Sequence, residues 1–182
     1  MKELAFLLPI DLEIRSELHN DITWAIAAEE LHKMDKFLAP QDKVDCIVRC
    51  AKVIFKSLSM ASARSAEQKR KEKQERGNKS NNESEDTGDA SSPPALAGAD
   101  DFLPIFIWVV LQSRAAGLYS TCEYVQAFYN PLNLMSKGGY CLVNLQSALE
   151  FIMNIDAQTL HMDSALFAQK CAECSGGPQI QT

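Results

Sequence analysis

Hydrophobic residues recur at helical spacing along the N-terminal part of the chain. Asn20 or Asp21 can cap a first helix that ends before Pro40, and its apolar stripe comprises Ala27, Leu31, Met34 and Leu38. Asp42 opens a second helix, which has the clearest period in the chain. One face of this helix carries Val44, Ile47, Val48, Ala51, Ile54, Phe55 and Leu58.

The same spacing returns after residue 98. A helix is expected from about Phe102 to Arg114, with Gly117 as its stop. Its residues 102–111 are apolar on every side, so it must be buried. Ser120-Thr121-Cys122-Glu123 matches a capping box. Two last helices are expected behind Asn144 and Asp163; their inward residues are Leu145, Ala148, Leu149 and Ile152, then Leu166, Phe167 and Cys171. No segment alternates at period two for long enough to predict a strand, so we expect an all-α, layered helical domain.

Residues 64–97 differ in kind from their flanks. The first part is dense in Lys, Arg, Glu and Gln, and the second in Asn, Ser, Asp, Gly and Pro. With almost no large apolar residue, this segment cannot offset its ordering entropy, which predicts a long disordered insertion between two helices that pack together. Its first half can continue the preceding helix for a few turns. Interleaved glutamates favour a solvated linker over a nuclear signal at Lys69-Arg70-Lys71.

Composition limits the classes of function. The 182 residues are 46% hydrophobic and carry a net charge of −6, which argues against nucleic-acid binding. The longest apolar run is about ten residues, too short for a membrane span, and the apolar start soon meets Asp11, so no signal peptide is expected. The placement of the six cysteines favours buried, reduced thiols in a cytoplasmic protein.

No catalytic or cofactor motif is evident. The chain lacks a phosphate-cradling glycine loop, a Gly-x-Ser-x-Gly elbow and a His-Glu-x-x-His motif, so no cofactor is expected. No metal site is expected either, because Cys171 and Cys174 form a single pair; only Cys46 and Cys50 could supply a second one in space. Trp24 and Trp108 are interpreted as core residues.

Two positions combine polar chemistry with an unusual setting. Asp100 and Asp101 directly precede the buried helix, where an Asp is a favoured N-cap, but one cap needs one carboxylate. The second acid could therefore be offered to a partner. Tyr140 follows Lys137-Gly138-Gly139, which is expected to be a flexible approach to the Asn144 helix; a loop tyrosine packed on the core is the alternative.

The run Gly98-Ala99-Asp100-Asp101-Phe102-Leu103-Pro104 resembles the signature of the vacuolar-protein-sorting-nine exchange domain, found in the Rabex-type exchange factors for Rab-five-class small GTPases. Shorter segments on both sides of this run also resemble the family, in the family's order. They are Pro40-Gln41-Asp42-Lys43, Leu118-Tyr119-Ser120, Tyr124-Val125-Gln126-Ala127-Phe128, Gly139-Tyr140, Asn144-Leu145 and Asp156-Ala157-Gln158. The resemblance implies an N-terminal helical segment over 1–19, an exchange domain over 20–175 with the disordered insertion at 64–97, and a flexible tail over 176–182.

The resemblance implies that the chain promotes GDP release from a Rab-family GTPase in endocytic traffic, without covalent chemistry. Asp100 would reach the GTPase's phosphate-binding lysine, and Asp101 would be free to cap the helix. The resemblance also implies GTPase-binding roles for Phe102, Pro104, Tyr140 and Asn144. We expect a monomer that reaches early endosomal membranes indirectly.

Two departures from the family pattern keep other functions open. Leu142 and Val143 stand where many members have a threonine, and Ser136-Lys137-Gly138 stands where a Gly-Glu pair is common. A degenerate domain that binds a Rab without exchanging its nucleotide is one alternative. A helical scaffold for another protein, in which the acids only cap, is a second.

Overall fold

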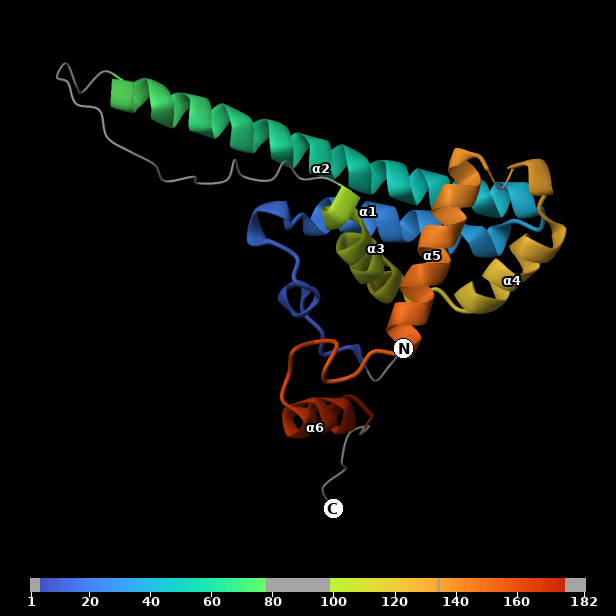
Figure 1. The fold of residues 1–182 in the computed structure, drawn as a ribbon. Helices are drawn as coiled ribbons and strands as arrows, with labels where there is room; N and C mark the ends of the chain where they lie inside the picture. Colours follow the sequence, from blue (N-terminus) through green and yellow to red (C-terminus); the bar gives the residue numbers. More distant parts are fainter. Residues whose placement is uncertain (1–3, 78–98, 134, 176–182) are drawn as a thin grey trace.

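The computed structural model describes residues 4–77, 99–133 and 135–175. Every regular element of these residues is helical, which confirms the predicted all-α fold. In chain order the elements are η2 (Pro9–Leu12), η3 (Ser16–Leu18), α1 (Asp21–His32), η4 (Lys33–Lys36), α2 (Pro40–Gly77), α3 (Ala99–Ser113), α4 (Leu118–Phe128), η5 (Pro131–Asn133), α5 (Lys137–Met153) and α6 (Ser164–Ser175). Figure 1 shows α1 and α2 as one layer with α3, α4 and α5 packed against it.

The first helix begins as predicted. The side chain of Asn20 accepts a hydrogen bond from the backbone N–H of Thr23 (3.1 Å), which satisfies one of the unpaired donors at the N-terminus of α1. Leu31 is fully buried, but Leu38, predicted on the same stripe, is 88% exposed. The stripe ends early because the α-helix stops at His32 and the chain tightens into η4.

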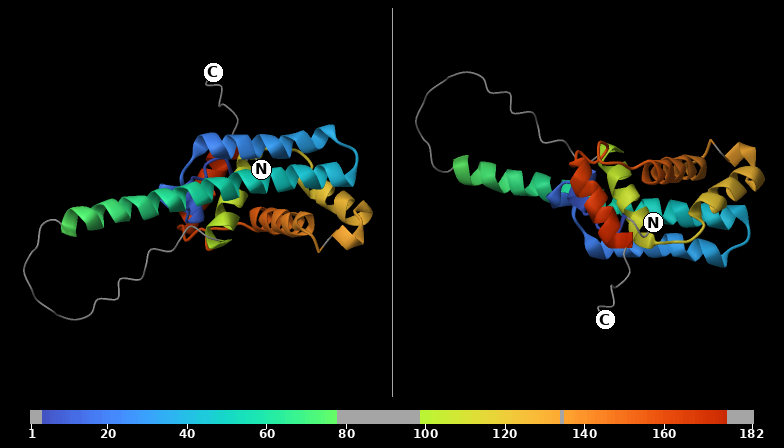
Figure 2. Two further views of the ribbon diagram at one scale, coloured as in Figure 1. Left: turned by 90° about the horizontal axis from the view of Figure 1, so that it is seen from above. Right: turned by 90° about the horizontal axis from the view of Figure 1, so that it is seen from below.

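The second helix is longer than its apolar period. Val44, Ile47 and Ile54 are fully buried, as their spacing predicts. The helix then continues into the polar segment as far as Gly77, and its C-terminal half extends beyond the other helices (Figures 1 and 2). Glu67 and Lys71 form an ion pair there (3.3 Å). The disorder expected of the remaining insertion falls on residues 78–98, outside the described residues.

The helix α3 lies at the centre of the packing. It contacts α1, α2 and α5, which explains why it is apolar on every side. Phe102 and Phe106 are buried, and Trp108 packs edge to face against Trp24 with ring centroids 6.5 Å apart, which confirms both tryptophans as core residues. The helix starts at Ala99, three residues earlier than predicted, so Asp100 and Asp101 lie inside its first turn instead of preceding it.

Two predicted helix starts are wrong for a common reason. The capping box at Ser120 does not start α4, which already begins at Leu118 behind Gly117 in the left-handed conformation (φ 67°), because Leu118 is buried in the core. Asn144 does not cap α5, which begins seven residues earlier with Ser136 as its N-cap. In both cases tertiary packing makes the helix begin before its local capping signal.

The two glycines before Tyr140 serve packing, not flexibility. Both lie in the first turn of α5, and Gly139 is buried. A Cβ atom on Gly138 would lie 2.8 Å from Cγ1 of Val44 and 2.9 Å from Oη of Tyr129. The absence of that atom lets the start of α5 approach α2 closely.

The N-terminal segment and α6 complete the described fold. Leu7, Leu12, Ile14 and Leu18 belong to the same hydrophobic cluster as the helices. Asp163 caps α6 as predicted, accepting hydrogen bonds from the backbone N–H groups of Ala165 (2.9 Å) and Leu166 (3.1 Å). Among the described residues, no single helix has the length and apolar character of a membrane span; residues 100–113 and 118–128 meet that test only as a pair, across a 114° bend.

Candidate functional site

The two acids of the Asp100-Asp101 pair have different environments. The side chain of Asp100 is exposed and makes no hydrogen bond or ion pair with another described residue. Asp101 is half-buried, and its Oδ2 accepts a hydrogen bond from Nη2 of Arg15 (2.8 Å) in an ion pair. Both carboxylates lie in the first turn of α3, at the positive end of the helix dipole. Asp100 is therefore the carboxylate of the pair that is open to a partner.

The aromatic core fixes the position of this first turn. Phe102 is only 1% exposed, and its ring stacks on Phe55 of α2 with centroids 4.3 Å apart and an interplanar angle of 2°. On the other side it stacks on Phe106 at 5.3 Å. Such contacts add to the apolar area that the ring buries. Phe102 thus lies beneath the two acids as a support and does not face solvent.

Pro104 lies one turn further along α3 and is half-buried. Because proline has no N–H, the carbonyl oxygen of Asp100 lacks the donor that an ordinary residue at 104 would supply. The helix starts at Ala99, so Pro104 lies beyond the first turn, where the N–H of an ordinary residue would be used. Pro104 also lines a pocket of about 270 Å³ together with Leu103, Ile107, Phe151 and residues of the N-terminal segment.

Tyr140 and Asn144 lie on successive turns of α5. Nδ2 of Asn144 donates a hydrogen bond to the backbone oxygen of Tyr140 (2.8 Å), so its amide is used within the helix. The side chains of Tyr140 and Val143 are 52% and 59% exposed, whereas Leu142 is buried. Helical spacing places Tyr140, Val143, Asn144 and Ser147 on one face. This face is the outward side of α5.

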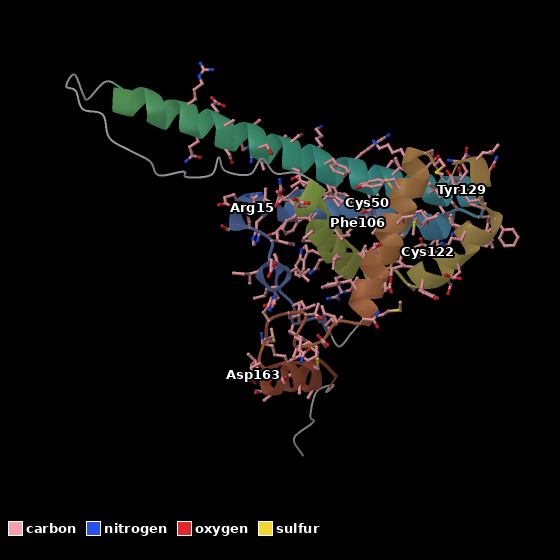
Figure 3. The ribbon with its side chains drawn as sticks, viewed as in Figure 1. Arg15, Cys50, Phe106, Cys122, Tyr129 and Asp163 are labelled. Carbon is pink, nitrogen blue, oxygen red and sulfur yellow. The ribbon has the colours of Figure 1, made fainter. Side chains whose placement is uncertain are left out.

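The structure brings the predicted residues onto two neighbouring helices. The helices α3 and α5 pack against one another, and each packs by its N-terminal part on α2, through Phe102 on Phe55 and through Gly138 beside Val44. Phe55 and Val44 are eleven residues apart, about 16 Å along the axis of α2 at a rise of about 1.5 Å per residue. Arg15 and Tyr129 mark the two ends of this arrangement in Figure 3. The predicted residues are therefore spread over two helices that pack on the same face of the fold.

Buried thiols in the core have little nucleophilic character. Burial raises the pKa of the Cys122 thiol to about 12, and it raises the pKa of Cys50 still further. Cys46 and Cys50 lie on α2 and Cys171 and Cys174 on α6. Across the described ranges, no group of three or more potential metal ligands comes together.

One residue beside the site was not found from the sequence. Arg15 lies in the N-terminal segment, 86 residues before Asp101, and no local pattern connects the two positions. Only the burial of Ile14 and Leu18, which fixes the path of the segment over the core, brings this arginine to α3.

Comparison with known proteins yields one family. The family model of the vacuolar sorting protein 9 (VPS9) domain matches residues 24–157. The chain is 33% identical to vacuolar protein sorting-associated protein 9A of rice over 165 residues, which is 91% of this chain and 29% of that protein.

Two animal proteins are similar over nearly the same range. The identity to the mouse Rab5 GDP/GTP exchange factor is 31% over 161 residues, covering 88% of this chain and 26% of that protein. For receptor-mediated endocytosis protein 6 of Caenorhabditis elegans it is 27% over 144 residues, covering 79% and 10%. The chain thus spans less than a third of each of these three relatives.

Proposed function

The chain belongs to the vacuolar sorting protein 9 (VPS9) domain family, and on that basis we propose that it is a guanine-nucleotide exchange factor that promotes GDP release from a Rab5-class small GTPase. The observation that carries the proposal is the exposed carboxylate of Asp100 at the start of a helix that is otherwise buried. A protein whose acids served only to cap the helix would not need this carboxylate free.

The exchange mechanism is a coupling between two binding equilibria. Asp100 pairs with the phosphate-binding lysine of the GTPase as nucleotide and magnesium leave. Its carboxylate thereby replaces part of the negative charge of the phosphate. The nucleotide-free GTPase then binds the domain tightly, and its affinity for nucleotide falls by the same factor. No covalent bond forms or breaks.

The other residues of the site have different roles in this proposal. Pro104 and Tyr140 contact the switch regions of the GTPase, half-buried Pro104 from α3 and exposed Tyr140 from the outer face of α5. Phe102 acts from the core by holding the first turn of α3, because its ring does not reach the surface. Asn144 orients the same turn of α5 through its hydrogen bond to Tyr140.

Val143 is the departure from the family pattern that faces a partner. Leu142 is buried, whereas Val143 is 59% exposed on the same face as Tyr140. The loss of a threonine hydroxyl therefore affects binding of a partner at position 143 and not at position 142. A valine there replaces a polar contact with an apolar one. This substitution is the observation that favours the second candidate function, a domain that binds a Rab GTPase without releasing its nucleotide.

Release of fluorescent GDP from a panel of purified Rab5-class GTPases tests the proposal. Nucleotide should leave at least one of them faster with the protein than without it. Binding of each GTPase in its nucleotide-free form is measured alongside. Tight binding with no faster release would establish the binding-only alternative, and neither binding nor release across the panel would refute both. In cells we expect the protein in the cytoplasm and at early endosomes, which a fluorescent fusion would reveal.

A further inference from the structure

The ion pair between Arg15 and Asp101 places a positive charge next to Asp100, the carboxylate proposed to meet the GTPase. The guanidinium lies 2.8 Å from Oδ2 of Asp101, and the side chains of the two residues are 41% and 19% exposed. Asp100 is the neighbouring residue in the same turn of α3. An arginine side chain is long and flexible enough to exchange between two adjacent carboxylates.

The backbone around Arg15 keeps its guanidinium at this place. Ile14 and Leu18 are 5% and 6% exposed and belong to the core cluster. The backbone oxygen of Arg15 accepts a hydrogen bond from the N–H of Leu18 (3.0 Å). The arginine is therefore held beside α3 by the packing of its neighbours, whether or not Asp101 is present to bind it.

We propose that Asp101 is a positioning residue that binds Arg15 and thereby keeps it from Asp100. This inference rests on the proposed exchange function, in which Asp100 must be free to meet a lysine of the GTPase. Without the Asp101 carboxylate, the guanidinium pairs with Asp100 and competes with that lysine. Arg15 lies outside the matched range 24–157, so the competing cation comes from the N-terminal segment.

Charge variants distinguish this competition from a purely structural role. Asp101→Asn should lower kcat/KM for GDP release about three- to fivefold at low ionic strength, the range in which an exposed ion pair shifts an equilibrium. The double variant Arg15→Ala/Asp101→Asn should recover to within about twofold of the wild type, because the competing cation is gone. Arg15→Ala alone should stay near the wild type. A structural ion pair instead predicts that Arg15→Ala is as damaging as Asp101→Asn and that nothing is recovered in the double variant.

Arg64 supplies the matched control, since it is an exposed arginine on α2. Arg64→Ala/Asp101→Asn removes the same net charge and should stay as slow as Asp101→Asn. The ratio of Asp101→Asn to wild type should approach one in about 0.5 M salt, where the Debye length is only a few ångströms. Thermal melts of all variants identify any that fail to fold.

The inference is overturned if Asp101→Asn releases GDP at the wild-type rate, or if the double variant stays as slow as Asp101→Asn. It is also overturned if Arg64→Ala restores activity as well as Arg15→Ala does. These outcomes leave the proposed function standing, provided that the wild-type protein accelerates release. A wild-type protein that is inactive on every Rab5-class GTPase would instead refute the proposed function.

Discussion

Replacing Gly138 by alanine tests the tight contact between α5 and α2. The added Cβ would lie 2.8 Å from Cγ1 of Val44, which is fully buried, and 2.9 Å from Oη of Tyr129, which is 6% exposed. Neither neighbour is free to move away, since each is packed in the core. Overpacking of this kind destabilises a protein by about 1–3 kcal/mol, and the gain in helix propensity returns at most about 1 kcal/mol. The net loss should be about 1–2 kcal/mol, which lowers Tm by about 2–8 °C for a domain of this size.

Chemical denaturation measures this loss, and a second substitution identifies its cause. In a Val44→Ala background the clash with Cγ1 is removed, so Gly138→Ala should cost at least about 0.5 kcal/mol less than in the wild type. Because Tyr140 follows two residues later, GDP release should slow together with the loss of stability. If Gly138→Ala is as stable as the wild type or more stable, helix propensity dominates and the close approach of α5 to α2 is refuted.

Three further predictions concern the acid, the aromatic support and a buried thiol. Asp100→Ala should lower kcat/KM for GDP release at least about 30-fold, as expected for truncating one partner of a desolvated charge pair, while Tm stays almost unchanged. Wild-type exchange by this variant would show that the wrong carboxylate has been chosen. Phe102→Ala should lower the free energy of unfolding by about 3–5 kcal/mol, measured by denaturant titration, and a loss below about 1 kcal/mol would contradict its burial between two rings. Above about pH 9 the Cys122 thiol ionises in the unfolded chain but stays protonated in the folded protein, where its pKa is raised to about 12. The unfolded state then binds fewer protons, so the free energy of unfolding should fall with rising pH over this window, by up to about 1.4 kcal/mol per pH unit from this thiol. Cys122→Ala should remove that part of the slope, and identical slopes would refute the assignment.

Local chemistry in the sequence was enough to locate most of the helices. Asn20 and Asp163 cap helices where their side chains predict it, because capping involves only residues two or three positions away. The apolar period after Asp42 marks the buried face of α2, since helical spacing alone decides which side chains share a face. The acid pair was likewise visible as two charges directly before an apolar run.

Signals at other helix starts were overruled by packing. Gly138 and Gly139 are typical of a flexible loop, and Asn144 is a good cap, yet all three lie inside α5. Glycine is favoured at position 138 because the start of α5 approaches Val44 and Tyr129 too closely for a Cβ there. No feature within a few residues of Gly138 contains that information, because Val44 is almost a hundred positions away in the chain.

The sequence by itself determined the helical class, the buried character of α3 and the presence of two acids at its start. Only the tertiary structure decided how the two acids differ. Asp101 is bound because the core holds Ile14 and Leu18, and with them Arg15, beside α3, whereas Asp100 is left open to solvent. The difference between two adjacent, identical side chains arises from a contact across 86 residues, and such a contact exists only once the chain has folded.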